Sequence, residues 1–427
     1  MNVKINPRPL SGTIHSITSK SHAHRLLIAS ALCKEPCMVH IKNTNEDLKA
    51  TSDCLSSLND EVPILNCQES GSTLRFLLPI AMVLKEKAVF LGSGRLPERP
   101  LSPLKEEMEA HGCTFEKQII SPAFSGEKET REIYTVSGRL RGGEFRLAGN
   151  VSSQYITGLL FALPLLEEDS KIIITSKLES VDYVILTLKV LETFGIHIDV
   201  QIKKEPSIED KKAYTFDIRG NQSYRAPKEV TAEGDWSNAA FWVVAGALGG
   251  ALRCENIIQD SFQGDKAVVD IVKSYHHKVK LEPTAVTTEK NRSISDTEEH
   301  IIDASNIPDL VPILSVLAAS HKGTTRIINA GRLRIKESDR LLAVADCLQI
   351  LGADVTELPD GLIIRGTGTL KGGRVSGYND HRMVMSMAIA SILCEEPVII
   401  NGAEAVNKSY PTFFEDFASL GGEYQLV

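Results

Sequence analysis

The sequence predicts an α/β protein made of six similar units, arranged as two domains of three units each. Six times along the 427 residues, a short polar cluster opens a run rich in Ala, Leu, Ile and small residues. Strand-like runs of Val and Ile lie between the helical segments. The chain is also longer than one compact core usually holds, and three units of roughly 70 residues make a domain of ordinary size.

Each polar cluster is predicted to begin a buried helix. Ser, Asn and Asp side chains can cap the free amides of a first turn, and the residues that follow are apolar on nearly every face. Self-similarity of this kind is typical of repeated supersecondary units. The six clusters span residues 19–29, 69–79, 150–160, 234–244, 306–316 and 378–388.

A second, amphipathic helix follows most clusters and usually ends at a glycine before a strand. These helices are predicted over 103–112, 186–195 and 339–352, with a less regular one over 265–276 that has no glycine stop. Strands are predicted between the helices, over 88–91, 171–175, 325–329 and 397–401. Polar, turn-rich segments at 202–212 and 287–300 are predicted to be hairpin tips or loops.

The domain prediction is discontinuous in sequence. If the first strand, residues 1–6, pairs in the C-terminal domain, the chain must cross between domains near 14–19 and again near 225–234. We therefore expect a C-terminal domain formed by 1–16 plus 235–427 and an N-terminal domain formed by 17–234.

Composition excludes several classes of partner. The net charge of −8 argues against broad binding to nucleic acid or to an anionic membrane. The longest apolar stretch, 241–252, is too short to span a bilayer, and the N-terminus has no signal-peptide core. The eight cysteines show no zinc spacing, so we expect reduced thiols in a cytoplasmic monomer without a metal or organic cofactor.

The polar clusters are richer in charge than capping requires. Lys20, Arg25, Arg340 and Arg382 stand at or near predicted helix starts, where free amides already attract anions. Arginine suits bidentate contacts with carboxylate or phosphate, and lysine suits phosphate. Nucleotide-binding glycine motifs and hydrolase motifs are absent from the sequence. These observations predict small polyanionic substrates.

In order and spacing, these clusters resemble the 5-enolpyruvylshikimate-3-phosphate synthase family over essentially the whole chain. The resemblance implies two domains of three βαβαββ units around buried parallel helices, the enolpyruvyl transferase fold, with the active site in the cleft between the domains. It implies transfer of the enolpyruvyl group from phosphoenolpyruvate to the 5-hydroxyl of shikimate 3-phosphate, through a tetrahedral intermediate, with release of phosphate in the shikimate pathway to chorismate and the aromatic amino acids.

The site residues carried over by motif fall into three overlapping groups. The shikimate-3-phosphate residues are Lys20, Ser21, Arg25, Ser152, Ser153, Gln154, Ser180, Tyr183, Asp309 and Lys336. The phosphoenolpyruvate residues are Lys20, Gly71, Arg99, Gln154, Arg340, Arg382 and Lys408. The catalytic residues are Asp309, Glu337, Lys20 and His381.

We expect Asp309, aided by Lys20, to take the hydroxyl proton and Glu337 to protonate C3 of phosphoenolpyruvate. A cleft full of cations should stand open when empty and close when shikimate 3-phosphate neutralises it.

Three positions depart from the family pattern. Glu69 stands where Asn is common, Phe76 where Pro is frequent, and Arg332 where Asn is frequent.

The sequence leaves two alternative functions open. A UDP-N-acetylglucosamine enolpyruvyl transferase would share the six units, but it typically begins its first motif with Lys-Asn, whereas this chain has Lys20-Ser21. A non-catalytic anion-binding or RNA-end-binding relative is disfavoured by the acidic net charge and by the joint presence of Lys20, Asp309, Glu337 and Lys408.

Overall fold

The computed structural model describes residues 1–120, 131–209, 212–291 and 298–427. The chain divides into two compact units, which we call unit 1 (Met1–Ser19 with Glu233–Val427) and unit 2 (Lys20–Ala232). The two chain crossings lie side by side within unit 1, because Thr18 forms an antiparallel bridge with Gly234 and the Ser19 amide donates to the Glu233 carbonyl at 2.7 Å.

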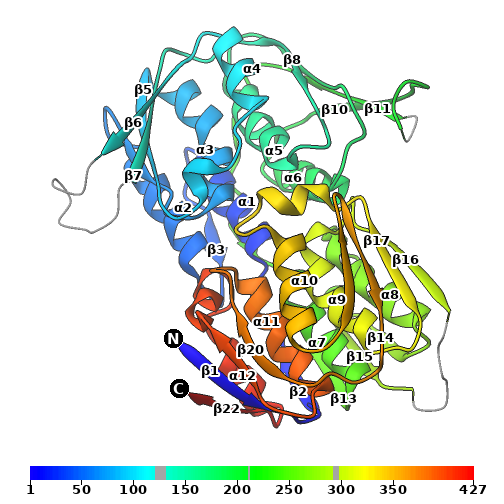
Figure 1. Cartoon of the computed structure of the whole chain (residues 1–427). Coiled ribbons are helices and arrows are strands. Elements are labelled where there is room, and N and C mark those ends of the chain that lie inside the picture. Colours follow the sequence, from blue (N-terminus) through cyan, green and yellow to red (C-terminus); the bar gives the residue numbers. More distant parts are fainter. Residues whose placement is uncertain (121–130, 210–211, 292–297) are drawn as a thin grey trace. The chain divides into compact units, whose positions relative to one another are not determined.

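Unit 2 has three repeats, two of them complete. The first complete repeat runs β4 (Ile64–Asn66), α3 (Gly71–Leu84), β5 (Lys87–Gly92), α4 (Leu104–Ala110), β6 (Thr114–Ile120) and β7 (Arg131–Ser137). The second runs β8 (Gly143–Leu147), α5 (Ser153–Ala162), β9 (Ser170–Ile174), α6 (Val181–Thr193), β10 (Asp199–Lys204) and β11 (Lys212–Ile218). Both follow the βαβαββ order, and their helices α3, α4, α5 and α6 are labelled in Figure 1.

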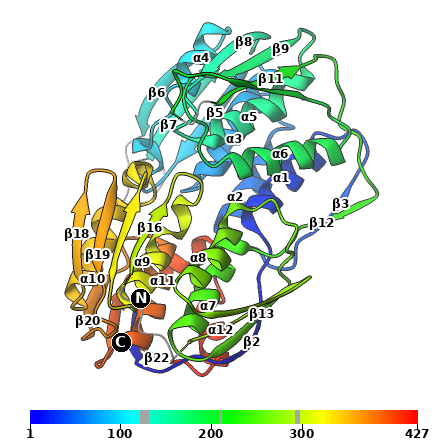
Figure 2. The same ribbon diagram turned by 90° about the vertical axis from the view of Figure 1, so that its right-hand side faces the viewer.

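The remaining repeat of unit 2 is reduced. It contains α1 (Lys20–Ala31), β3 (Met38–His40) and α2 (Glu46–Ser57), and β3 pairs in parallel with β12 (Glu229–Thr231) from the end of the unit. The two short strands lie side by side in Figure 2.

Unit 1 also has three repeats. One runs β16 (Glu299–Asp303), α9 (Val311–Ala319), β17 (Thr324–Ile328), α10 (Arg340–Ile350), β18 (Asp354–Leu358) and β19 (Gly361–Arg365). The other two borrow strands from the N-terminus, β1 (Asn2–Asn6) and β2 (Gly12–His15). Their other elements are α7 (Trp236–Leu248), β13 (Ala251–Glu255), α8 (Val268–Ser274), β14 (Lys278–Glu282), β15 (Ala285–Glu289), β20 (Gly373–Ser376), α11 (His381–Ala390), β21 (Val398–Asn401), α12 (Phe413–Ser419) and β22 (Glu423–Leu426).

The four-stranded sheets in the described residues share one pairing pattern. The first two strands of each repeat pair in parallel, and the remaining pairs are antiparallel, as in the order β4-β5-β7-β6. In the sheet that holds both chain ends, β1 takes the place of an internal strand between β21 and β22. The sequence prediction of an α/β fold with repeated βαβαββ units is confirmed by this pattern.

The first helix of each complete repeat is buried because its residues are apolar on all sides. Every residue of α7 is buried, including Trp236 and Trp242, and the same holds for every residue of α9. In unit 2, α3 and α5 cross closely at Gly158, where a Cβ atom would lie 2.4 Å from the carbonyl oxygen of Arg75. Only glycine allows the two backbones to approach so far.

Three local predictions differ from the structure. The segment 287–300, predicted to be a hairpin tip or loop, includes the end of β15 and the start of β16, and its residues 292–297 lie outside the described residues. The helix predicted to start at residue 186 starts at Val181, because Ser180 adopts a left-handed conformation with φ of +53° and Asp182 occupies the first turn. The segment 202–212, predicted to be a tip or loop, includes the end of β10 and the start of β11, since the two strands pair as far as Lys204 and Lys212.

Candidate active site

The predicted site residues of unit 2 gather around the N-termini of α1, α3, α5 and α6. Lys20 is the first residue of α1, and its Nζ donates to Oδ2 of Asp47 at 2.7 Å. Asp47 lies in the first turn of α2, where a negative charge is favoured by the helix dipole. The ion pair thus joins the starts of two helices, and both side chains are about one-sixth exposed.

Arg25 is buried one turn further along α1 and is held by neutral oxygens. Its guanidinium donates to the hydroxyl of Thr187 at 2.8 Å and to the carbonyls of Ser21 and Tyr183 at 2.7 and 3.1 Å. Among the described residues, its hydrogen-bond acceptors are all uncharged. Burial lowers the pKa of Arg25 to about 10. A buried cation with no counter-charge favours an anionic ligand.

Gly71 begins α3 and lies against two arginines. A Cβ atom at Gly71 would lie 2.6 Å from Nη1 of Arg75 and 2.8 Å from Nη1 of Arg99. Arg75 also donates to Oε1 of Gln154 at 2.9 Å, and Nε2 of Gln154 donates to the hydroxyl of Ser72 at 2.9 Å. The start of α3, the Arg99 loop and the start of α5 therefore form one connected surface that offers amides and guanidinium groups.

The remaining predicted residues of unit 2 lie at the starts of α5 and α6. Ser152 is the N-cap of α5 and accepts a hydrogen bond from the Gln154 amide, and Ser153 is the first helical residue. Ser180 occupies the corresponding position before α6 and is buried. The Tyr183 ring lies next to Arg25, whose Cζ is 6.0 Å from the ring centroid.

In unit 1, Arg340 gathers three carboxylates at the starts of α9, α10 and α11. Its Nε donates to Asp380 at 2.7 Å, Nη1 to Asp309 at 2.8 Å and Nη2 to Glu337 at 2.8 Å. Arg340 and Asp380 are 1% and 0% exposed. Burial alone would lower the pKa of Arg340, but Asp380, Glu337 and Asp309 raise it above its ordinary value. Arg340 is therefore a permanent cation.

Asp309 receives two further cations. Nη2 of Arg382 donates to it at 3.2 Å, and Nζ of Lys336 lies 3.5 Å from its Oδ1. Burial would raise the pKa of Asp309, but Arg382, Lys336 and Arg340 together hold it well below its usual range. Burial also lowers the pKa of Lys336 to about 8. The cluster thus pairs a firmly ionised carboxylate with an amine that can exchange a proton near neutrality.

The last two predicted residues of unit 1 flank the same place. His381 is buried and is the first residue of α11, directly after the N-cap Asp380. Lys408 is buried, and its Nζ donates to the carbonyl of Asn379 at 2.7 Å. The predicted residues of unit 1 therefore lie together around Arg340 and Asp380.

The three departures from the family pattern have defined surroundings. The Glu69 carboxylate lies against Gly94, where a Cβ atom would come within 2.6 Å of Oε2. The Phe76 ring lies under Arg25, with 5.2 Å between Cζ and the ring centroid. Arg332 donates to the Ser305 carbonyl at 2.6 Å.

Three residues that contact the predicted site residues and position them were not predicted from the sequence. Asp47 pairs with Lys20, Arg75 links Gly71 to Gln154, and Asp380 anchors Arg340. Arg75 and Asp380 stand inside the polar clusters 69–79 and 378–388, whereas Asp47 lies outside all six clusters. The partners come from 27 to 79 residues away in sequence, and no local pattern specifies such pairings.

The described residues offer little for other kinds of site. In residues 1–120, 131–209, 212–291 and 298–427, we find no group of three or more His, Cys, Asp or Glu side chains suited to a metal ion. Among the helices described there, none combines the length and the apolar character required to cross a bilayer.

Known proteins resemble this chain over most or all of its length. The profile of the family described as EPSP synthase (3-phosphoshikimate 1-carboxyvinyltransferase) matches residues 59–417. The 3-phosphoshikimate 1-carboxyvinyltransferase of Clostridium novyi is 43% identical, over 99% of this chain and 98% of its own. That of Clostridium perfringens is also 43% identical, over 98% of each chain.

Solved structures show the same fold. An EPSP synthase from Acinetobacter baumannii superimposes over 100% of both chains with a TM-score of 0.76 at 22% identity. The enolpyruvyl transferase NikO from Streptomyces tendae covers 99% of this chain and 98% of its own, with a TM-score of 0.74 at 15% identity. With the family profile matched over most of its length and curated relatives at 43% identity, the chain belongs to the EPSP synthase (3-phosphoshikimate 1-carboxyvinyltransferase) family.

Proposed function

We propose that this chain transfers the enolpyruvyl group of phosphoenolpyruvate to the 5-hydroxyl of shikimate 3-phosphate, giving 5-enolpyruvylshikimate 3-phosphate and phosphate. The chain is then a transferase of chorismate and aromatic amino acid biosynthesis. The observation that carries the proposal is the charge pattern of the two residue clusters: buried arginines with neutral or shared partners, at helix N-termini that already favour anions.

In this proposal, the unit 2 cluster binds most of shikimate 3-phosphate. Ser152, Ser153, Ser180 and Tyr183 offer hydroxyls, and Arg25 supplies a buried charge with no carboxylate partner among the described residues. Lys20, Ser21 and Gln154 complete this contact surface, and Asp309 and Lys336 contribute from unit 1. The phosphate would satisfy the charge of Arg25, which offsets the cost of its burial.

Phosphoenolpyruvate contacts Lys20, Gly71, Arg99 and Gln154 from unit 2. From unit 1 it contacts Arg340, Arg382 and Lys408. Gly71 presents backbone amides close to Arg99 without a side chain in the way, which suits a small anion held by a helix start. These cations also stabilise the charge that moves onto the phosphate as the tetrahedral intermediate collapses.

The proton transfers are assigned to Asp309, Glu337, Lys20 and His381. Asp309 is held ionised, and it takes the proton of the 5-hydroxyl, aided by Lys20, as the hydroxyl oxygen attacks C2. Glu337 is the proposed donor to C3, which becomes a methyl group and later returns a proton when phosphate leaves. His381 lies beside the cluster as a further proton carrier.

We also propose that the two clusters serve one reaction in a cleft between the domains 17–234 and 1–16 plus 235–427. The split of the predicted residues between the two clusters supports this proposal. The free state of all eight cysteines fits action in the cytoplasm.

The test is phosphate release from phosphoenolpyruvate by the purified full chain. Shikimate 3-phosphate should support release, and UDP-N-acetylglucosamine should not. Release only with UDP-N-acetylglucosamine would assign the chain to the other transferase reaction, and release with neither acceptor would contradict the proposal.

A further inference from the structure

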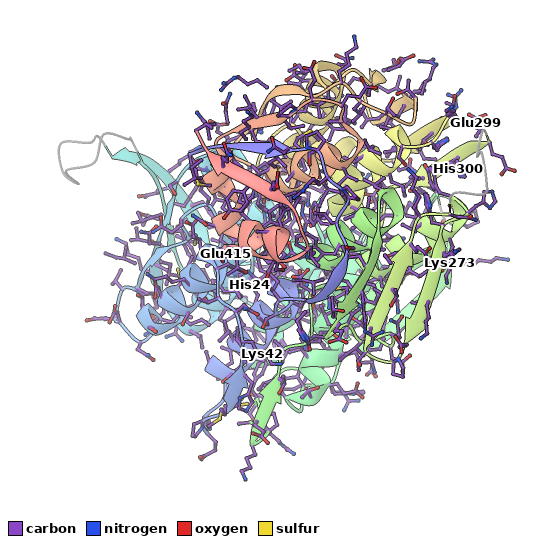
Figure 3. The ribbon with its side chains drawn as sticks, turned by 90° about the horizontal axis from the view of Figure 1, so that it is seen from below. His24, Lys42, Lys273, Glu299, His300 and Glu415 are labelled. Atoms are coloured by element: carbon purple, nitrogen blue, oxygen red, sulfur yellow. The ribbon has the colours of Figure 1, made fainter. Side chains whose placement is uncertain are left out.

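A buried histidine outside the proposed site begins a chain of hydroxyl groups that reaches that site. His24 lies on α1, and its position is labelled in Figure 3. It is 1% exposed, and its Nδ1 lies 2.8 Å from the hydroxyl of Thr51 on α2. Burial and then the charges of Lys20 and Arg25 lower its pKa well below the ordinary value. The imidazole is therefore neutral, with one N–H group to place.

The chain continues through two more buried hydroxyls. Oγ1 of Thr51 lies 2.6 Å from Oγ1 of Thr73, and Thr73 donates to Oγ of Ser70 at 2.7 Å. Thr51, Thr73 and Ser70 are each at most 1% exposed. Ser70 is the N-cap of α3 and also accepts from the Thr73 amide at 3.3 Å. The chain thus runs from α1 across α2 to the start of α3.

The direction of donation follows from counting hydrogens. A hydroxyl has one hydrogen, and the Thr73 hydroxyl donates it toward Oγ of Ser70 at 2.7 Å and the Asp47 carbonyl at 3.5 Å. Thr73 must then accept from Thr51, and Thr51 must accept from Nδ1–H of His24. Nε2 of His24, which has no hydrogen-bond partner among the described residues, carries no hydrogen in this arrangement.

Both ends of the chain lie next to residues of the proposed phosphoenolpyruvate contact. Lys20, one turn before His24, pairs with Asp47 on α2. Gly71 follows Ser70 and lies against Arg75 and Arg99. Since three helices carry these groups, their spacing depends on what joins the helices, and Thr73 also lies 3.5 Å from the Asp47 carbonyl.

We propose that His24 is a positioning residue, whose Nδ1–H group orders the Thr51–Thr73–Ser70 chain and thereby holds the start of α3 in register with Lys20 for phosphoenolpyruvate binding. The inference rests on the proposed function, because the affinity for phosphoenolpyruvate is what depends on the spacing between Lys20 and the start of α3. It assigns no direct substrate contact to His24.

The chemistry offers a matched pair of variants. In His24→Asn, the side-chain amide nitrogen replaces Nδ1 and keeps a donor toward Thr51. In His24→Gln, the amide nitrogen falls near the position of Nε2, so the donor toward Thr51 is lost and buried oxygens are left unsatisfied. We expect KM for phosphoenolpyruvate to rise about tenfold in His24→Gln and to stay within about threefold of wild type in His24→Asn. The dissociation constant for shikimate 3-phosphate should change little in either. Equal KM values for the two variants would overturn the proposal.

A second measurement does not depend on any variant folding or on activity. The ring ¹⁵N chemical shifts of His24 in the wild-type chain at pH 7 should show the Nδ1–H tautomer. An Nε2–H tautomer would overturn the proposal. If wild type releases no phosphate from phosphoenolpyruvate with shikimate 3-phosphate, the proposed function fails, while the tautomer still decides whether the chain is ordered as inferred.

Discussion

Arg340 and Asp380 form an ion pair in which both side chains are buried, with Nε of the arginine 2.7 Å from Oδ2 of the aspartate. Asp380 is at the same time the N-cap of α11, where its Oδ1 accepts from the Arg382 amide at 3.0 Å. One carboxylate therefore fixes both a helix start and the guanidinium that also binds Asp309 and Glu337. The pair ties the geometry of the unit 1 cluster to the stability of unit 1.

This pair predicts a large stability loss in Arg340→Met. Removing the cation leaves the fully buried carboxylate of Asp380 without its ion-pair partner, which costs about 3–5 kcal/mol. The measurement is urea unfolding followed by tryptophan fluorescence, which reports on unit 1 because the two tryptophans of the chain both lie in α7. Arg334→Met is the matched control. Arg334 is 29% exposed in its pairs with Asp339 and Glu357, so we expect a loss of at most about 1 kcal/mol. Equal losses would contradict the prediction.

Gly71→Ala is predicted to weaken phosphoenolpyruvate binding. The new methyl group would lie 2.6 and 2.8 Å from the guanidinium nitrogens of Arg75 and Arg99, which must move away. A displaced arginine contact should raise KM for phosphoenolpyruvate roughly tenfold to a hundredfold, with a smaller effect on shikimate 3-phosphate. In the control Gly331→Ala, the nearest atom is an ordinary 3.6 Å away, so steady-state kinetics should show no such rise.

The pKa of Lys336 predicts a pH dependence of shikimate 3-phosphate binding. With a pKa of about 8, lowered chiefly by burial, Lys336 is cationic below pH 8 and loses its charge above it. The affinity of an anionic ligand should therefore fall as the pH rises through 8, by roughly tenfold between pH 7 and 9. Isothermal titration calorimetry of wild type and Lys336→Arg checks this, because arginine stays charged over that range. If the affinity of Lys336→Arg for shikimate 3-phosphate falls as much between pH 7 and 9 as that of wild type, another group causes the pH dependence.

Glu337→Gln tests the assignment of the proton donor. The amide cannot protonate C3, so kcat should fall by about 10²–10⁴. Incorporation of solvent deuterium into the methyl group should slow in parallel. Exchange as fast as in wild type would mean that another residue delivers the proton.

Domain closure is predicted to follow binding of shikimate 3-phosphate. Arg25 is a buried cation whose hydrogen-bond acceptors among the described residues are all uncharged, so the phosphate should neutralise it and favour a compact state. Small-angle X-ray scattering should show a smaller radius of gyration with shikimate 3-phosphate than without it, and no decrease with inorganic sulfate at the same ionic strength. An unchanged radius of gyration would contradict domain closure on binding of shikimate 3-phosphate.

Much of the fold could be read from the sequence because its signals are local. Ser70, Ser152, Asp235, Asp339 and Asp380 cap helices where polar clusters meet apolar runs, and the structure shows each cap bond. Helix ends moved by several residues where a backbone conformation decided them, as at Ser180. The extent of β10 and β11 depended on strand pairing that an isolated polar segment does not reveal.

The sequence by itself determined which segments carry charge, and it determined a family resemblance with the residues that resemblance implies. Only the tertiary structure decided the partners: Asp380 for Arg340 from 40 residues away, Gln154 for Arg75 from 79, and Thr51 for His24 from 27. The physical reason is that capping and periodicity act within a few residues, whereas the pairing of buried polar groups is settled by how helices from different repeats pack. In that packing, a buried cation such as Arg25 meets only neutral oxygens among the described residues, while Arg340 meets three carboxylates.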